Sequence, residues 1–139
     1  MDMKLELVIL PVSDVDRAKA FYLDRAGFAL DVDHQAGDDF RVVQLSPPGS
    51  ACSIAVGKGI SDQAPGSVQG LHLVVTDIVA ARRQLLDRGV EVGEIRHLGA
   101  AGWEGGPHPE RTDYNSFADF HDPDGNGWLL QERGFAAEA

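Results

Sequence analysis

The sequence predicts an α+β fold built from two tandem β-α-β-β-β modules, and three observations lead to this prediction. Strand-like and helix-like patterns follow the same order in the two halves of the 139-residue chain. The segments Val12-Ser13-Asp14 and Val75-Thr76-Asp77 stand directly before the helical pattern of each half. A turn that leads into a short strand, at residues 122–131, has a counterpart at residues 46–55. Agreement in position as well as pattern indicates a duplicated module.

The first module is expected over residues 4–57. An aliphatic and β-branched strand at residues 5–12 has a proline near its end, where a ladder donor is least needed. Ser13 or Asp14 can cap a helix over residues 15–25, and Gly27 can end it in a left-handed conformation. Three further strands are predicted, at residues 28–32, 40–45 and 52–56.

The second module is expected over residues 70–133, after a Gly-, Ser- and Pro-containing linker at residues 58–69. A strand at residues 71–77 leads into a helix at residues 78–88, which Gly89 can end. The remaining strands are predicted at residues 90–96, 117–120 and 128–131, and a short tail at residues 134–139.

The segment from Leu98 to Tyr114 has no counterpart in the first module. It is rich in glycine and contains two prolines, so it is predicted to be a long loop, and a loop of this length in a small domain is commonly functional. We expect it to form a lid or pocket wall in which Trp103 stacks on a ligand, Tyr114 supplies a phenol and Arg111 holds an anionic group.

Composition excludes several classes of partner. The formal net charge of -10 repels phosphate backbones and anionic lipids, so neither nucleic acid nor a membrane surface is an expected partner. No stretch approaches the roughly 20 apolar residues that span a bilayer. The first residues are acidic rather than basic, so we expect a cytoplasmic protein without a secretory signal. The single cysteine, Cys52, excludes an internal disulfide.

The motifs together resemble the vicinal oxygen chelate (VOC) superfamily, the group of glyoxalase I, extradiol dioxygenases and the bleomycin and fosfomycin resistance proteins. The motifs are the Val-x-Asp of each module, Phe21-Tyr22 in the first helix and Asp122-Pro123-Asp124-Gly125-Asn126 before the last strand. The resemblance covers nearly the whole chain, as a single VOC domain of residues 1–139. It implies a curled, half-barrel mixed sheet around a concave cavity, helices on the outside, and a homodimer.

The resemblance also implies four places for the ligands of a divalent metal. Counting from the Val-x-Asp aspartates and from Asn126, these places hold Leu7, Gly70, Ser53 and Leu129. Such an ion prefers imidazole nitrogen or carboxylate oxygen. No cofactor is therefore predicted at the usual site. An unconventional metal site made by His72 with the other histidines, His34, His97, His108 and His121, stays open.

A ligand cavity is nevertheless expected on the concave face. Alternation along the strands places His72 two residues beyond Gly70 and Gln131 two residues beyond Leu129, on the same faces. His72 is the candidate general base, because imidazole exchanges protons near neutral pH. The residues predicted to bind the ligand are Leu7, Ile9, Ser53, His72, Trp103, Arg111, Tyr114, Leu129 and Gln131.

Three functions are compatible with these residues. The leading hypothesis is a glyoxalase-like protein that binds a small aromatic or drug-like molecule without the usual metal. The second is a VOC enzyme, a lyase, isomerase or dioxygenase, that uses His72 or an unconventional metal. The third is a structural or regulatory module. Fold resemblance alone does not separate them, because one fold hosts many chemistries.

Overall fold

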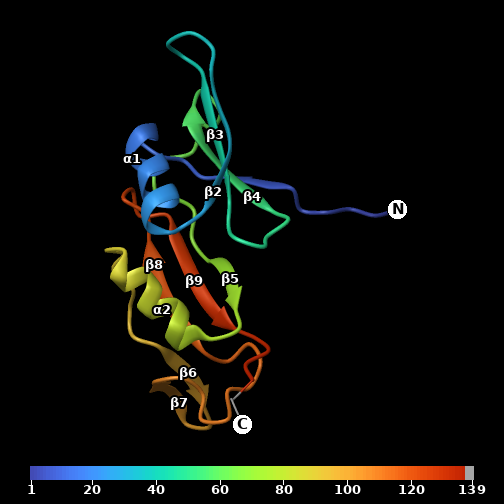
Figure 1. The fold of residues 1–139 in the computed structure, drawn as a ribbon, viewed down its shortest axis with the longest axis vertical. Coiled ribbons are helices and arrows are strands. Elements are labelled where there is room, and N and C mark those ends of the chain that lie inside the picture. The colour runs from blue at the N-terminus through green and yellow to red at the C-terminus, as the bar shows by residue number, and fades with distance from the viewer. Residues whose placement is uncertain (137–139) are drawn as a thin grey trace. The chain divides into compact units, whose positions relative to one another are not determined.

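The structure is a computed structural model that describes residues 1–136, and the chain divides into two compact units (Figure 1). The first unit contains residues 1–68 together with the turn at residues 122–126. The second contains residues 69–121 and the chain from Gly127 onward. Part of the predicted tail, residues 137–139, lies outside the described residues. None of the helices in residues 1–136 is long and apolar enough to cross a membrane.

The first unit is a four-stranded mixed sheet with one helical segment. Its elements are β1 (Leu7–Ile9), α1 (Val15–Ala20), the π-helical turn η1 (Phe21–Arg25), β2 (Ala29–Gln35), β3 (Arg41–Ser46) and β4 (Ser53–Lys58). The strand order is β1-β4-β3-β2, and β1 runs parallel to β4. The predicted helix is confirmed: Asp14 accepts a hydrogen bond from the backbone N–H of Arg17, and Gly27 ends the segment at φ 79°.

Two predicted strand boundaries in this unit are wrong. The first strand is shorter than residues 5–12, because only Leu7–Ile9 pairs with β4. β2 instead continues past residue 32 to Gln35. Its polar end stays in the sheet because Asp33 accepts hydrogen bonds from Lys19 and Arg41, which satisfy a carboxylate that the sequence pattern assigned to a loop.

The second unit is a five-stranded mixed sheet with one helix. Its elements are β5 (Leu71–Val75), α2 (Ile78–Asp87), β6 (Arg96–Gly99), β7 (Gly102–Gly105), β8 (Phe117–His121) and β9 (Gly127–Glu132). The strand order is β5-β9-β8-β6-β7, and β5 runs parallel to β9. Asp77 caps α2 by accepting a hydrogen bond from Ala80 N, as Asp14 caps α1.

The segment between α2 and β8 differs most from the prediction. The expected strand at residues 90–96 is wrong: Val92 forms only an isolated bridge, and β6 begins at Arg96. The expected long loop is also wrong in part, because β6 and β7 form a hairpin with Leu98 opposite Trp103. β6 ends and β7 begins with a glycine, and Gly102 adopts φ 119°. The glycines that suggested a long loop therefore form the tight turn of a hairpin. The second module therefore contains one strand more than predicted.

In each unit a helix covers one face of the sheet. α1 packs on β4, and α2 packs on β8 and β9. The buried apolar side chains larger than alanine are, in the first unit, Leu10, Phe21, Tyr22, Phe28, Val43, Leu45, Ile54 and Val56, and in the second, Ile78, Leu85, Val90, Val92, Ile95, Phe120, Trp128 and Leu130. Neither sheet in the described residues closes into a barrel. The predicted α+β fold of two modules with outer helices is confirmed.

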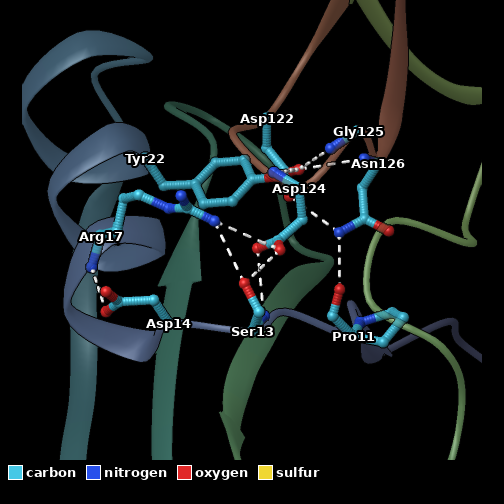
Figure 2. Close-up of polar contacts among 9 residues, drawn as sticks. All are labelled: Pro11, Ser13, Asp14, Arg17, Tyr22, Asp122, Asp124, Gly125 and Asn126. Carbon is cyan, nitrogen blue, oxygen red and sulfur yellow. Dashed lines mark hydrogen bonds and ion pairs between the residues drawn. The ribbon is translucent and has the colours of Figure 1, made fainter.

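The acidic turn at residues 122–126 is held together from within (Figure 2). The Asp122 Oδ1 atom accepts hydrogen bonds of 2.9 to 3.0 Å from the backbone N–H groups of Asp124, Gly125 and Asn126. The Asn126 side chain, which is fully buried, donates to Asp122 Oδ2 at 2.8 Å. Pairing these amides inside the turn removes the cost of burying them unsatisfied.

The same turn is bonded to the segment that begins α1. Asn126 Nδ2 donates to the carbonyl of Pro11 at 2.9 Å, and Ser13 donates to both carboxylate oxygens of Asp124 through its backbone N–H and its hydroxyl. Arg17 completes the group with an ion pair to Asp124 at 3.3 Å. These contacts explain why a turn between two strands of the second sheet belongs to the first unit.

Candidate functional site

The second sheet has a face that α2 does not cover, and we call it the open face. Residues that are neighbours on paired strands project to the same side of a sheet. The pairings of β5, β9 and β8 therefore form two rows on the open face: His72, Leu129 and Asp119 in one, and Val74, Gln131 and Phe117 in the next. Val74 is 53% exposed, so apolar surface is accessible there.

The β6–β7 hairpin extends the open face with an aromatic and charged cluster. Arg96 pairs with Phe117, and its guanidinium carbon lies 5.2 Å from the centre of the Trp103 ring. The Trp103 and Phe117 rings meet edge to face at 5.6 Å. Arg96 also bonds Asp119 at 2.9 Å. Trp103 stays 58% exposed, so a broad aromatic surface is held in place by Arg96 and Phe117 and remains accessible.

Sequence reasoning named Trp103 but missed Arg96, Phe117 and Asp119. The alternation of Phe117 and Asp119 with buried Ala118 and Phe120 would have placed the first two on one face. Arg96 could not be found in this way, because the strand that carries it was expected to end there.

His72 lies on the open face, as predicted, and its ring has a defined orientation. Its Nδ1 atom is 2.8 Å from the carbonyl oxygen of Gly70. Because a carbonyl only accepts, Nδ1 carries the hydrogen, and Nε2 of the neutral ring is left as an acceptor. The register also places His72, rather than Gly70, beside Leu129. Gln131 stands in the next row and donates to the carbonyl of Tyr114 at 3.1 Å.

Three predicted residues lie in the first unit. Leu7 and Ile9 are 37% and 38% exposed, and Leu7 pairs with Ser53. Ser53 is nearly buried and lies 2.6 Å from the hydroxyl of Ser46, which itself donates to Asp31. Since the single proton of Ser46 points to Asp31, Ser53 is the donor of the pair. Leu7 and Ile9 are available to a ligand, whereas the Ser53 hydroxyl is engaged.

Arg111 lies in a partly buried ion pair. Its guanidinium donates two hydrogen bonds, of 2.8 and 2.6 Å, to the carboxylate of Glu132, which is fully buried. A third, of 3.3 Å, reaches Asp77, and Glu132 also accepts from the first amide of α2, Ile78 N. The hydrogen bonds that Arg111 donates to Glu132 raise the pKa of Arg111 above its ordinary value. These contacts give Arg111 a structural task, and its predicted role in holding an anion remains a prediction.

Tyr114 is half exposed, with the Arg133 guanidinium 5.6 Å from its ring centre. Its backbone adopts φ 65°, and that of Arg111 adopts φ 52°, a region that bulky side chains rarely enter. The backbone N–H of Tyr114 bonds the carbonyl of Glu132 at 2.7 Å, which helps to hold this conformation. Unfavourable backbone conformations are concentrated at functional sites, so these two residues indicate a functional role for the segment after the hairpin.

The residues present do not fit the metal of the VOC superfamily. Leu7, Gly70 and Leu129 have no ligating atom, and the Ser53 hydroxyl is bonded to Ser46. Within residues 1–136, no group of three or more His, Cys, Asp or Glu side chains is arranged to hold a metal ion. The ring centres of His97 and His108 lie 5.5 Å apart, but His97 bonds Gly106 and Glu104 through its two nitrogens.

A hollow of about 500 Å³ lies in the first unit beside the start of α1. It is polar, and it contains none of the predicted ligand-binding residues. Its arginine, Arg41, is already paired with Asp16 at 2.7 Å and with Asp33 at 3.0 Å, and the amine of Lys58 donates to the carbonyl of Asp38. The open face is therefore the better candidate site for an apolar or aromatic molecule.

The comparisons with known proteins agree with this architecture. The family model of the Glyoxalase/Bleomycin resistance protein/Dioxygenase superfamily matches residues 4–130, and the chain belongs to this family. The VOC resemblance predicted from the motifs is thereby confirmed.

Individual relatives are similar over nearly their whole length. TnmS3, an antibiotic binding protein from Streptomyces sp. CB03234, is 33% identical, with 94% of this chain and 96% of that chain covered and a TM-score of 0.72. A glyoxalase/bleomycin resistance protein from the same Streptomyces is 34% identical, with 92% and 99% covered and a TM-score of 0.70. YetH of Bacillus subtilis (strain 168), an uncharacterized protein, is 27% identical, with 95% and 100% covered.

Proposed function

We propose that this protein binds a small aromatic or drug-like molecule on the open face of its second sheet, without the usual metal. The observation that carries the proposal is the accessible Trp103, fixed by Arg96 and Phe117 beside a row that holds His72 and Leu129. Aromatic and apolar side chains with a few placed polar groups are typical of sites for small organic ligands. The likeness to an antibiotic binding protein at 33% identity supports the same class of ligand.

A thermal-shift screen with aromatic antibiotics tests this proposal, because a molecule that binds only the native state raises the melting temperature by mass action. A compound that raises the melting temperature of the wild type is then tested on Trp103→Ala. Loss of the aromatic surface is expected to lower affinity at least tenfold. The matched control is Leu86→Ala, which removes an apolar side chain of similar exposure from α2. Equal effects of the two substitutions would contradict the proposal.

A second candidate function is enzymatic, and the orientation of His72 favours it. With Nδ1 held by the Gly70 carbonyl, the Nε2 lone pair can take a proton from a substrate over Leu129. Lyase, isomerase or dioxygenase chemistry can be screened with methylglyoxal-thiol adducts and catechols. His72→Gln is expected to abolish any turnover that depends on this base, and His34→Gln, on β2 of the first unit, is the control. Full turnover in His72→Gln would remove the candidate.

We also propose a homodimer, with edge strand β1 and the residues before it as the contact surface. β1 pairs only with β4 in the described sheet, and Met3 and Leu5, which precede it, are 88% and 72% exposed. An edge strand with accessible apolar side chains favours pairing with another chain. Analytical ultracentrifugation of the wild type is expected to give twice the chain mass of 14.9 kDa. The double variant Met3→Lys, Leu5→Lys is expected to sediment with the mass of a single chain. A wild-type monomer, or an unchanged dimer in the variant, would contradict this surface.

A further inference from the structure

We infer that Asp119 and Arg96 determine which ligands the open face accepts, favouring a planar aromatic molecule with an amine or hydroxyl donor over one with a carboxylate. This inference rests on the proposed ligand-binding function. It assigns the choice between ligands to an ion pair that lies outside the four positions at which VOC proteins carry their metal ligands.

The position of Asp119 makes its carboxylate accessible to a ligand on the aromatic surface. It stands beside Leu129 on the neighbouring strand, and Leu129 stands beside His72. A flat molecule over Leu129 therefore has Asp119 on one side and His72 on the other, at about one strand spacing each. The Asp119 side chain is 46% exposed, so a ligand can reach it.

The pairing of Asp119 leaves one oxygen to accept. Arg96 Nη1 bonds Oδ1 at 2.9 Å, and no donor in the described part of the chain is bonded to Oδ2. On the other side of Leu129, the Nε2 atom of the neutral His72 ring is also an acceptor. Two acceptors that flank an apolar patch favour a ligand with hydrogen-bond donors at its edges.

Arg96 does not make the face a binding site for anions. Its charge is balanced by Asp119, and its guanidinium lies against the Trp103 ring at 5.2 Å. An anionic ligand would have to compete with Asp119 for this arginine. A ligand cation, in contrast, can bond Oδ2 while the Arg96 pair stays intact.

The test compares two fluorescent probes of the same three-ring shape and opposite charge, 9-aminoacridine and anthracene-9-carboxylate, by fluorescence anisotropy. The wild type is expected to prefer the aminoacridine. Asp119→Asn frees Arg96, and we expect the ratio of cation to anion affinity to fall about tenfold. Arg96→Gln frees Asp119, and we expect the ratio to rise about tenfold. Asp62→Asn removes an equal charge from an exposed position of the first unit, and the ratio should change less than twofold.

The opposite directions of the two variants separate selection from damage to the fold, since a structural defect would weaken both probes together. If both probes bind the wild type but the ratio is the same in Asp119→Asn and Arg96→Gln, the inference is wrong and the proposed binding face stands. If neither probe binds the wild type, the inference and the proposed aromatic site both fail.

Discussion

The Tyr22 hydroxyl donates a 2.8 Å hydrogen bond to Asp122 Oδ2 across 100 positions of sequence, and both side chains are buried. Asp122 uses its other oxygen to hold the turn amides, so one carboxylate fixes the turn and ties it to the helical segment of the first unit (Figure 2). The Phe21-Tyr22 and Asp-Pro-Asp-Gly-Asn motifs, which identified the family, are thus two parts of one contact.

Tyr22→Phe tests how much this hydrogen bond contributes to the stability of the fold. Removing the hydroxyl leaves a buried carboxylate oxygen with one donor fewer, so the free energy of unfolding should fall by about 1.5 to 3 kcal/mol, the usual range for a hydrogen bond to a charged group. Urea denaturation measures the change. Tyr114→Phe is the control, since that ring is half exposed, and it should cost less than about 0.5 kcal/mol. Equal stability of Tyr22→Phe and wild type would show that the bond is not a structural anchor.

Arg111→Gln should destabilise the protein far more than Arg96→Gln, although each substitution removes an arginine that is paired with carboxylates. Arg111 pairs with Glu132, which is fully buried, and its loss leaves that charge without its main partner, at a cost of about 3 kcal/mol. Arg96 and Asp119 are both more than a third exposed, so water screens them, and the cost should stay below about 1 kcal/mol. Urea denaturation of both variants under the same conditions measures the two free energies of unfolding. Similar losses of stability in the two variants would contradict a structural role for Arg111.

Asp33 should make stability depend on pH in the acid range. The hydrogen bonds from Arg41, and then from Lys19, lower the pKa of this carboxyl well below its ordinary value. A lowered folded-state pKa stabilises the native state above the unfolded pKa of about 4, and this stabilisation is lost as pH falls further. Asp33→Asn should therefore cost about 1 to 2 kcal/mol at pH 7, and this cost should shrink progressively as the pH falls below about 4. The control Asp62→Asn should leave the dependence of stability on pH unchanged. If Asp33→Asn loses stability with falling pH as steeply as the wild type, the pH dependence comes from other carboxylates and the prediction is wrong.

The predictable parts of the fold are those that local chemistry determines. Asp14 and Asp77 cap their helices, and Gly27 and Gly89 end them with positive φ, because these roles need only neighbouring residues. The β6–β7 hairpin was missed because Gly102 is typical of a loop, and only its pairing with Gly99 makes it part of a strand. The contact of Arg111 with Glu132 could not be predicted either, because it joins residues 21 positions apart.

For the candidate site, alternation along strands placed His72, Leu129 and Gln131 on one face correctly. It could not reveal that Asp119 stands next to Leu129, since that depends on the register between β8 and β9. It also could not place Arg96 in the site, because the predicted strand ended at Arg96 whereas β6 begins there.

The two tryptophans of the chain provide the most direct test of the central claim, that a small molecule binds the open face. Trp103 lies exposed on that face, whereas Trp128 is 5% exposed and stacks with Phe120 on the covered face. In a nitrogen-15 NMR titration with 9-aminoacridine, with Trp103→Phe used for assignment, we expect saturable shifts of the Trp103 indole N–H resonance and little change at Trp128. Saturable binding that moves Trp128 and leaves Trp103 unchanged would place the ligand elsewhere and contradict the account.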